Sequence, residues 1–240
     1  MKKMVVFILS LYSLSLLAED TAIYQKIRSV FSDQNNVNIR PYNSTLLEIE
    51  VGEKIYFASS NGQYIFAGPI IDTESRKDLL KEKLDQKRQK TLSKATPDSF
   101  LTFPASSDRQ HKITMFTDID CPYCRKTHQF MGEFNQAGIE VNYVVIPRGG
   151  PDSKGFNRVV SILCSADPRE AITQVMGGSE LKEQQCEHSL IKHAQLAHSL
   201  GIASTPATVL ADGSLHMGLM TPARLQKLLQ SQSGSTPVSE

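Results

Sequence analysis

Four cysteines are the residues whose type and spacing point most directly to chemistry, and they divide into a close pair and a wide pair. Cys121 and Cys124 are separated by two residues, whereas Cys164 and Cys186 lie far apart in the chain. A cysteine attacks as its thiolate, and a second cysteine one helical turn away can attack the disulfide that the first has formed. The close pair therefore predicts thiol–disulfide exchange, with Cys121 attacking and Cys124 resolving.

The residues around Cys121 predict that its sulfur lies at the start of a helix. A strand predicted over 112–116 is followed by Asp118, and helical sequence begins at Pro122, which suits a first turn because it lacks an N–H group. The unpaired N–H groups of that turn stabilise a thiolate. We therefore expect Cys121 to be the exposed, thiolate-rich sulfur of the pair, and Asp118 to cap the helix or the preceding turn.

Other titratable side chains give no support for a metal site. His128 lies two helical turns beyond Cys121, roughly 10 Å along the axis, so we expect no contact with that sulfur. Arg125 is one turn away, and a solvated arginine is the simpler interpretation than one that tunes the sulfur. Three further histidines recur every five residues, a spacing that scatters them around a helix: His188, His193 and His198. We predict no metal and no cofactor.

Three alternative uses of the close pair stay open from the residues alone: a zinc knuckle, a Cu(I) site and an inert surface disulfide. Zinc needs a second clustered ligand pair, and Cys164 and Cys186 are too far apart in sequence to form a knuckle of their own. Copper handling is a further alternative because soft thiolates favour Cu(I). An even number of cysteines also fits two disulfide pairs.

The N-terminus has the layout of a secretory signal peptide. Lys2 and Lys3 precede an apolar run over 4–17, and Ala18 stands before acidic residues. This run is shorter than the roughly 20 residues that span a bilayer, and no later segment is predicted to span one. We expect cleavage near Ala18 and export to a compartment where disulfides persist. The 26 lysines and arginines nearly balance the 25 aspartates and glutamates, so composition does not favour a nucleic-acid partner.

The segment over 21–71 reads as one small unit. Its predicted elements are a helix over 23–31 and strands over 46–51, 54–57 and 64–67. Asn61-Gly62 predicts a tight hairpin in which both residues take positive φ. Such a unit is too small to bury a substantial core, so it needs the rest of the chain or a second copy. Its apolar strand residues, expected to be poorly covered in one copy, are Ile55, Phe57, Ile65 and Phe66.

The remainder of the chain reads as a charged connection followed by an α/β unit with a mixed sheet. Residues 72–95 predict a solvated linking helix, because no adequate apolar stripe runs through them. A loop bounded by Pro97 and Pro104 follows. Strands are predicted over 112–116, 141–146, 207–210 and 215–217, and helices over 122–135, 153–165, 168–176, 187–200 and 221–230. Asp212-Gly213 predicts a hairpin turn.

Three segments together resemble the periplasmic disulfide isomerases of the DsbC/DsbG type. They are 116–124 (FTDIDCPYC), 146–150 (IPRGG) and 205–207 (TPA). With the wide cysteine pair and the small N-terminal unit, the resemblance covers nearly the whole mature chain. It implies an α+β architecture with a small dimerisation domain over 19–71, a linker helix and loop over 72–104, a thioredoxin-fold domain with a helical insertion over 105–232, and a polar tail over 233–240.

The resemblance also implies roles for particular residues. Cys164 and Cys186 form a structural disulfide in the helical insertion. Thr205-Pro206 is a cis peptide opposite the active site, and the Thr205 backbone holds an extended substrate segment. The substrate also contacts the two residues between the active cysteines, Pro122 and Tyr123.

The implied partners are a second copy of the chain, misfolded or oxidised exported proteins, and a membrane thiol reductant of the DsbD type. Pro122-Tyr123 resembles the DsbG-like variant, whereas glycine in the first place is typical of the principal isomerase. Residues between the cysteines influence the redox potential, so the balance between isomerase, reductase and oxidase stays open. A chaperone that binds unfolded chains without using its cysteines is the alternative from another class.

Overall fold

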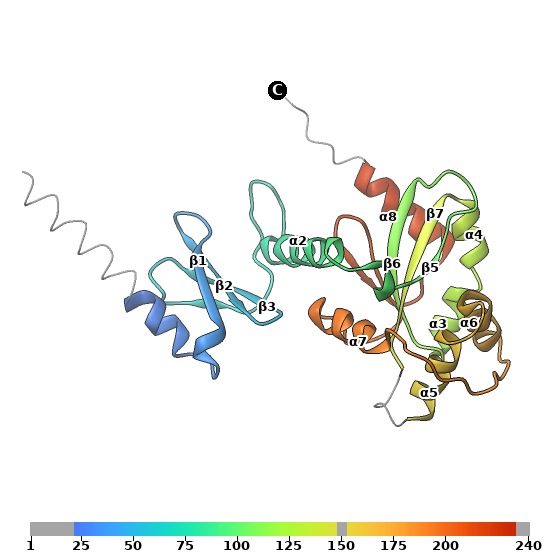
Figure 1. Cartoon of the computed structure of the whole chain (residues 1–240). Helices are drawn as coiled ribbons and strands as arrows, with labels where there is room; N and C mark the ends of the chain where they lie inside the picture. The colour runs from blue at the N-terminus through green and yellow to red at the C-terminus, as the bar shows by residue number, and fades with distance from the viewer. Residues whose placement is uncertain (1–21, 148–152, 234–240) are drawn as a thin grey trace, which may run out of the picture. The chain divides into compact units, whose positions relative to one another are not determined.

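The computed structural model describes residues 22–147 and 153–233, which divide into two compact units at Leu84 and Asp85 (Figure 1). The predicted signal peptide, the 148–150 part of the second resemblance motif, and the tail from residue 234 lie outside the described residues. Within the described ranges, none of the helices has both the length and the apolar composition needed to cross a membrane.

An antiparallel sheet with the strand order β1-β2-β3-β4 forms the first unit. Its elements are a helical segment at 22–28, the short η1 (Gln34–Asn36), β1 (Val37–Pro41), β2 (Leu46–Val51), β3 (Lys54–Ser59) and β4 (Ile65–Phe66). The helix and β2, β3 and β4 were predicted, but β1 was missed. Its inward-facing residues are only Val37 and Ile39, with polar neighbours and Pro41, so the strand pattern is short.

Both faces of this sheet bury side chains. On one face, Ile27 of the helical segment packs against apolar strand residues such as Ile39 and Ile49. On the other, Phe57 is fully buried and lies edge-on to Tyr42, with the ring centroids 5.2 Å apart. The prediction that Ile55 and Phe57 are poorly covered in one copy is therefore wrong. The large apolar residues left exposed in this unit are Val30, Tyr64, Phe66 and Ile71.

A buried carboxylate fastens the start of α2 (Leu79–Ser93) to this sheet. Glu48 is 1% exposed and pairs with Arg40 and with Lys83, whose Nζ lies 3.1 Å from Glu48 Oε2 and 5.0 Å from the centre of the Tyr42 ring. Burial alone raises the pKa of Glu48, but hydrogen bonds from Arg40 and Lys83 outweigh it and lower that pKa. The buried charge is thus compensated from two sides.

Helix α2 departs from the predicted linking helix in two respects. It begins at Leu79 rather than near residue 72, because the Asp78 carboxylate caps it by accepting hydrogen bonds from the backbone N–H groups of Leu80 and Lys81. It is also not solvated all round. The side chains of Asp85 and Arg88 are only 14% and 13% exposed and form an ion pair of 2.7 Å.

The turns also differ from the prediction. In the β3–β4 hairpin only Gly62 has a positive φ, +64°, and Asn61 instead accepts a hydrogen bond from the Gln63 N–H through its side chain. The tight two-residue loop is Gly52-Glu53 between β2 and β3, with a positive φ at Gly52. Asn and Gly suit several turn types, so the pair Asn61-Gly62 did not by itself specify which turn forms.

A five-stranded mixed sheet with the order β5-β7-β6-β8-β9 forms the second unit. Its strands are β5 (Leu101–Phe103), β6 (His111–Thr117), β7 (Ile139–Val145), β8 (Ala207–Val209) and β9 (Leu215–Met217). Strand β6 is central and parallel to β7, and the other pairs are antiparallel. The region between Pro97 and Pro104 was predicted as a loop, but it contains η2 (Pro97–Ser99) and the edge strand β5.

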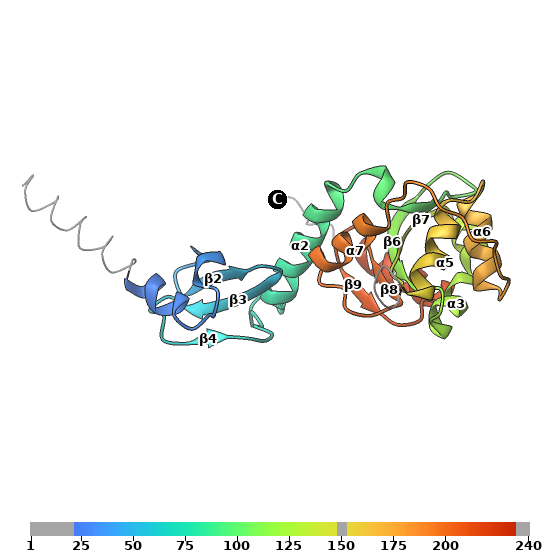
Figure 2. The same cartoon turned by 60° about the horizontal axis from the view of Figure 1, so that its bottom comes forward.

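Helices cover both faces of this sheet (Figure 2). They are α3 (Pro122–His128), α4 (Met131–Gln136), α5 (Lys154–Leu163), α6 (Pro168–Met176), α7 (Leu190–Ser199) and α8 (Pro222–Ser233). Buried residues of α3 to α6 and α8 form one core cluster with the sheet, which Leu190 of α7 joins, and Leu196 and Ala197 of α7 belong to the other cluster. The helix predicted over 122–135 is interrupted by a turn at Gln129 and Phe130.

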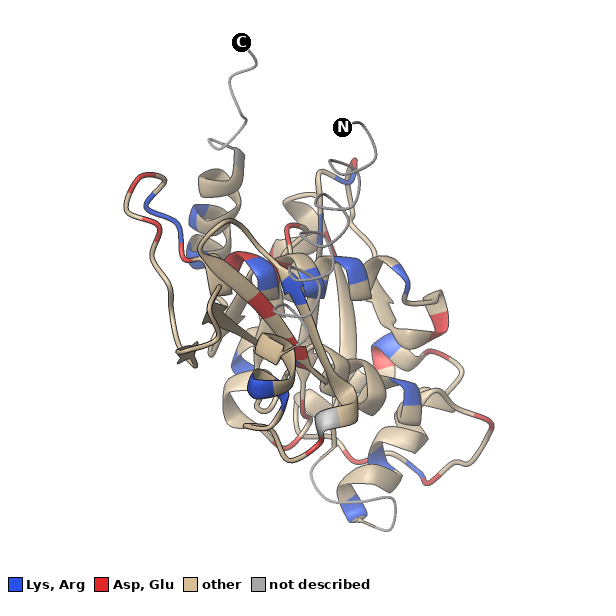
Figure 3. Ribbon diagram, turned by 90° about the vertical axis from the view of Figure 1, so that its left-hand side faces the viewer, with Lys and Arg blue, Asp and Glu red and all other residues tan. Residues whose placement is uncertain are grey.

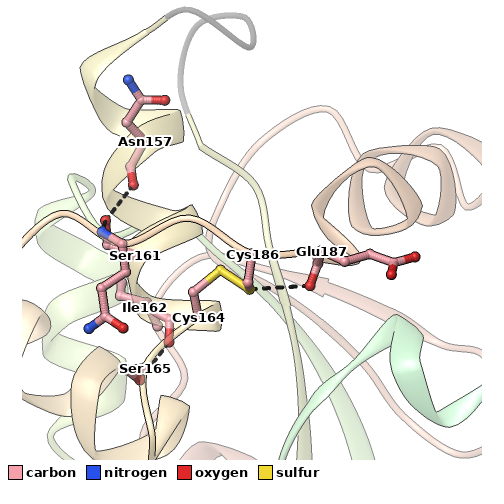
Figure 4. Close-up of a disulfide and its surroundings, with 8 residues drawn as sticks. Asn157, Ser161, Ile162, Cys164, Ser165, Cys186 and Glu187 are labelled. Carbon is pink, nitrogen blue, oxygen red and sulfur yellow. Dashed lines mark hydrogen bonds between the residues drawn. A yellow bond between two sulfur atoms is a disulfide. The ribbon is translucent and has the colours of Figure 1, made fainter.

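Cys164 and Cys186 are joined by a disulfide (Figure 4). Cys164 ends α5, whereas Cys186 lies in the segment 179–189, which has no regular secondary structure. The Gln184 N–H also donates a hydrogen bond of 3.1 Å to Ser161 Oγ of α5. The Cys186 sulfur lies 3.2 Å from the Glu187 carbonyl oxygen, a contact without a proton because the sulfur is in a disulfide. Closing a loop of this length contributes on the order of 3 kcal/mol to stability.

Charge does not separate into large regions of one sign. Figure 3 shows basic and acidic positions interspersed along the ribbon, in keeping with the formal net charge of +1.

The β8–β9 turn yields a test of its packing on α2. Gly213 (φ +85°) and Gly218 (φ +87°) share a left-handed backbone, but a Cβ at Gly213 would lie 1.9 Å from the Asp85 carbonyl oxygen, whereas a Cβ at Gly218 meets nothing within 4 Å. We expect Gly213→Ala to lower the free energy of unfolding by about 2 kcal/mol more than Gly218→Ala, because only the first forces backbone apart. Urea denaturation measures both, and equal losses would contradict this docking.

Candidate active site

The central strand places Cys121 at the N-cap of α3. Strand β6 ends at Thr117, a short turn follows, and Cys121 has an extended backbone with φ −85° and ψ 119°. Pro122 occupies the first helical position, where its missing N–H has no intrahelical partner. The predicted helix start is confirmed. Asp118 caps the turn, since its Oδ1 accepts a hydrogen bond of 2.9 Å from the Asp120 N–H.

The surroundings of the Cys121 sulfur favour its thiolate. Burial opposes ionisation, but hydrogen bonds from the Cys124 backbone N–H, the Cys124 thiol, the Tyr123 N–H and the Thr205 side chain together lower the pKa of Cys121 below its ordinary value. As a thiol, Cys121 donates to the Thr205 carbonyl oxygen at 3.6 Å. Cys121 is therefore prepared to act as a nucleophile at a lower pH than an ordinary cysteine.

Cys124 has the opposite character. It is completely buried, and this burial raises its pKa to about 11, although the Asp118 N–H donates a hydrogen bond of 3.4 Å to its sulfur. The expectation that Cys121 is exposed is wrong, because it is only 3% exposed. Burial is the larger influence on Cys124, whereas at Cys121 the hydrogen-bond donors outweigh burial. Both cysteines are present as free thiols.

The Thr205-Pro206 segment lies against the cysteine pair. Its peptide bond is cis, and Pro206 is buried while Thr205 is half-buried. A hollow of about 310 Å³ adjoins Thr205, with Asp118 and Pro147 among its lining residues. The residues between the cysteines are exposed, and Lys126 lies over the Tyr123 ring at 5.8 Å. Thr205 and Tyr123 thus border the same pair of thiols from different elements.

Charged side chains stabilise the turn before Cys121 through a hydrogen bond and an ion pair. Arg125, predicted to be solvated, is 36% exposed and donates a hydrogen bond of 2.8 Å to the Ile119 carbonyl oxygen. Arg158 of α5 pairs with Asp120 at 2.6 Å. Sequence reasoning missed Arg158 because no local signal relates a residue of α5 to the turn after β6.

Two histidines that sequence analysis left without a role are buried. His128 does not contact Cys121, as expected, and instead forms hydrogen bonds with Tyr143 and Thr173. His193 accepts a hydrogen bond of 3.1 Å from the Val145 N–H at the end of β7. Burial lowers the pKa of each histidine to about 4, so both are neutral near pH 7. In the described part of the chain, no three His, Cys, Asp or Glu side chains are grouped to hold a metal ion.

Comparison with family models divides the chain as its two sheets do. Residues 103–233 match the model of a thioredoxin-like domain. Residues 15–81 match the model of the disulfide bond isomerase protein N-terminal domain.

Curated relatives match over nearly their full length. The chain is 30% identical over 245 residues to the thiol:disulfide interchange protein DsbC of Dickeya dadantii, with 98% of each chain covered. It is 28% identical over 220 residues to DsbC of Escherichia coli, with 91% of each chain covered.

Solved structures share the fold of more than half of the chain. A disulfide interchange protein from Neisseria gonorrhoeae matches with a TM-score of 0.50 at 19% identity, covering 57% of this chain and 97% of that one. A linker-deletion variant of ScsC from Proteus mirabilis matches with a TM-score of 0.52 at 20% identity, covering 66% and 88%. At these identities the likeness concerns the fold alone.

The different surroundings of the two sulfurs predict two steps in a pH titration. Alkylation of the reduced protein should rise first at Cys121, below the ordinary cysteine range, and only near pH 11 at Cys124. Mass spectrometry of peptides alkylated at successive pH values measures each site. Equal profiles for the two cysteines, or an earlier rise at Cys124, would contradict the asymmetry.

Proposed function

Because the chain belongs to the DsbC-type thiol:disulfide interchange proteins, with their N-terminal and thioredoxin-like domains, we propose that it isomerises and reduces disulfides of exported proteins through Cys121 and Cys124. The observation that carries the proposal is the asymmetry of the pair, in which hydrogen bonds lower the pKa of Cys121 while burial raises that of Cys124 to about 11. One sulfur is ready to attack, and the other is held as a thiol.

In the first step, the Cys121 thiolate attacks one sulfur of a substrate disulfide. A bond forms between Cys121 and that sulfur, the substrate disulfide breaks, and the second substrate sulfur leaves as a thiolate that takes a proton from water. The donors around Cys121 stabilise its charge before attack. Because they also make it a good leaving group, the mixed disulfide stays reversible.

The mixed disulfide then has two outcomes. In isomerisation, another substrate thiolate attacks the substrate sulfur, a rearranged substrate disulfide forms, and Cys121 leaves as a thiolate. In reduction, Cys124 loses its proton and attacks the Cys121 sulfur, so the reduced substrate leaves and Cys121–Cys124 becomes oxidised. A high pKa at Cys124 favours the first outcome, because it lengthens the life of the mixed disulfide.

Substrate binding is assigned to the residues that border the pair. Thr205 presents backbone beside Cys121 and adjoins the hollow of about 310 Å³, and Pro206 holds this segment in its cis form. Exposed Pro122 and Tyr123 offer apolar surface next to the attacking sulfur. An extended peptide can thus place its disulfide at Cys121 while pairing with the Thr205 backbone.

The other parts of the chain serve this reaction indirectly. Residues 19–71 act as a dimerisation domain, 72–104 as linker helix and loop, and 105–232 as the catalytic domain. The Cys164–Cys186 disulfide is structural, because it ties the irregular segment 179–189 to α5 and does not turn over with the active pair. Residues 1–18 are a signal peptide cleaved near Ala18 that delivers the chain to the periplasm, where DsbC homologues reside.

A source of electrons and a class of disulfide-containing substrates complete the proposed cycle. After reduction of a substrate, a membrane thiol reductant of the DsbD type returns Cys121 and Cys124 to thiols. The substrates are misfolded or oxidised exported proteins. One alternative function is a dithiol oxidase that donates disulfides, which would use the same two cysteines in the opposite direction. A second alternative is a holdase chaperone, which would need neither cysteine.

Refolding assays with cysteine variants test the assignment. We expect Cys124→Ser to accumulate mixed disulfides with scrambled substrate protein and Cys121→Ser to form none, because only Cys121 attacks. The wild type should recover activity of scrambled substrate faster than it oxidises reduced substrate. If Cys121→Ser traps substrate and Cys124→Ser does not, the attacking and resolving roles are reversed. A preference for reduced substrate would identify an oxidase. If Cys121→Ser has no exchange activity but still fully protects substrate from aggregation, the protein is a holdase.

Dimerisation is assigned to the edge at β4. This strand is short and lies at the end of the sheet, and its residue Phe66 is exposed together with Tyr64 before it and Ile71 after it. Pairing between two copies satisfies its open backbone groups and covers these side chains. Two catalytic domains held in one dimer then form a cleft for a misfolded chain and shield each Cys121 from oxidation by another protein.

Single substitutions in the full chain test this assignment. Phe66→Glu should produce monomers in sedimentation, lose activity on scrambled substrate and retain alkylation of Cys121, because the catalytic unit is untouched. Val30→Glu is the matched control, since Val30 is an exposed apolar residue of the same unit that does not belong to β4. A dimer that survives Phe66→Glu, or a monomer with full isomerase activity, would refute the role of this edge.

A further inference from the structure

A buried hydrogen-bonded chain runs from the sheet through the active-site helix to α6. His128 Nδ1 lies 3.1 Å from the Tyr143 hydroxyl of β7, and His128 Nε2 lies 3.0 Å from Thr173 Oγ1 of α6. His128 is 6% exposed and Tyr143 is 1% exposed. The Phe103 ring lies edge-on to both, with ring centroids 5.6 Å and 5.3 Å away. These side chains leave the His128 ring no room to turn freely.

The direction of every hydrogen bond in this chain follows from Thr173. Its hydroxyl donates to the Arg169 carbonyl oxygen at 2.8 Å, so its single proton is committed there. Thr173 Oγ1 must therefore accept from His128, which places the imidazole proton on Nε2. His128 Nδ1 is then an acceptor, because the ring is neutral at pH 7. Tyr143 consequently donates its only proton to His128.

The same face of α3 carries the resolving cysteine. Cys124 and His128 are four residues apart in α3, so their side chains lie one above the other. Cys124 and Tyr143 belong to one buried core cluster. Burial first, and then a negative charge on Cys124, raise the pKa of Tyr143, so the sulfur and the phenol interact electrostatically through this interior.

We propose that His128 is a positioning residue for the redox site, which holds the Tyr143 hydroxyl proton away from Cys124 and so keeps Cys124 a thiol while the mixed disulfide rearranges. A phenol that turned its proton toward the sulfur would stabilise the thiolate. By accepting that proton, His128 withholds a donor from Cys124. The proposal rests on the proposed resolving role of Cys124 and adds what sets the timing of resolution.

The other groups that face Cys124 do not control the direction of the Tyr143 hydroxyl proton. On the side of the turn, the Asp118 backbone N–H donates to the Cys124 sulfur, and hydrogen bonds from the side chains of Thr117 and Thr205 also lower the pKa of Cys124. On the side of the helix start, Cys121 shares hydrogen bonds with Cys124. From α6 the contact is the uncharged Thr173, and Arg125 of α3 borders the same outer pocket as His128. Tyr143 is thus the titratable group whose donor direction His128 decides.

The test measures the rate at which Cys124 resolves a mixed disulfide at Cys121 in a single turnover. A peptide disulfide is attached to Cys121 of the full-length protein, and mass spectrometry measures the rate at which it is released as Cys121–Cys124 forms, across a range of pH. In His128→Phe the Tyr143 hydroxyl loses its acceptor, and we expect its proton to turn toward Cys124. We expect the pH profile to move down by about one unit and release near pH 7 to quicken about three- to tenfold, the lower figure allowing for the weaker nucleophile.

Matched variants separate this role from a structural one. His128→Gln keeps an acceptor for Tyr143 and should restore the wild-type profile. Tyr143→Phe removes the proton altogether, so His128→Phe should have no further effect in that background. His193→Phe is the control, since His193 is equally buried but its acceptor serves the Val145 N–H. His193→Phe should lower the melting temperature without shifting the pH profile of peptide release.

The proposal is overturned if His128→Phe slows release, leaves its pH profile unchanged, or acts equally with Phe at position 143. Thr173 is exposed, so Thr173→Val provides the test if His128→Phe does not fold. That change loosens the His128 tautomer and should move the profile in the same direction by a smaller amount, and an unchanged profile overturns the proposal. A wild-type mixed disulfide that never resolves would instead refute the role of Cys124.

Discussion

The hydrogen bonds donated to the Cys121 sulfur are the interaction on which the rest of the catalytic unit depends. Two of the donors are backbone N–H groups of the first turn of α3, so they exist only if the helix begins at Cys121. That start requires β6 to end at Thr117 and the Asp118 turn to close. The central place of β6 in the sheet therefore determines where the nucleophile lies.

Burial is the constraint that turns two identical side chains into different reagents. Both sulfurs are inside the protein, where ionisation is disfavoured unless donors compensate for lost water. Cys121 receives enough donors to lower its pKa, and Cys124 does not. The hydrogen bonds of His128, Tyr143 and Thr173 belong to the same balance, because a buried donor that is committed elsewhere is unavailable to the sulfur.

The N-terminal unit is a small sheet that stays folded because both of its faces are covered. It covers one face with a short helix and places a compensated carboxylate, Glu48, on the other, with Lys83 of α2 reaching it. This arrangement explains why Phe57 is buried within one copy, contrary to the prediction. Of the four apolar strand residues expected to be poorly covered in one copy, Phe66 is the one that is exposed.

Features governed by neighbours in sequence were determined by the sequence itself. The cysteine spacing, the helix start at Cys121, the strand β2 and the helix α6 follow from hydrogen bonds and side-chain periodicity within a few residues, so local rules predict them. Only the tertiary structure decided that His128 lies between Tyr143 and Thr173 and that Gly213 packs on Asp85. The resemblance implied that Thr205 lies opposite Cys121, and the structure adds the contact of its carbonyl with that sulfur. These contacts join residues of different elements, and their partners depend on how the sheet and helices pack. The edge strand β5 was missed for the same reason, since three residues between prolines become a strand only when β7 supplies the hydrogen bonds.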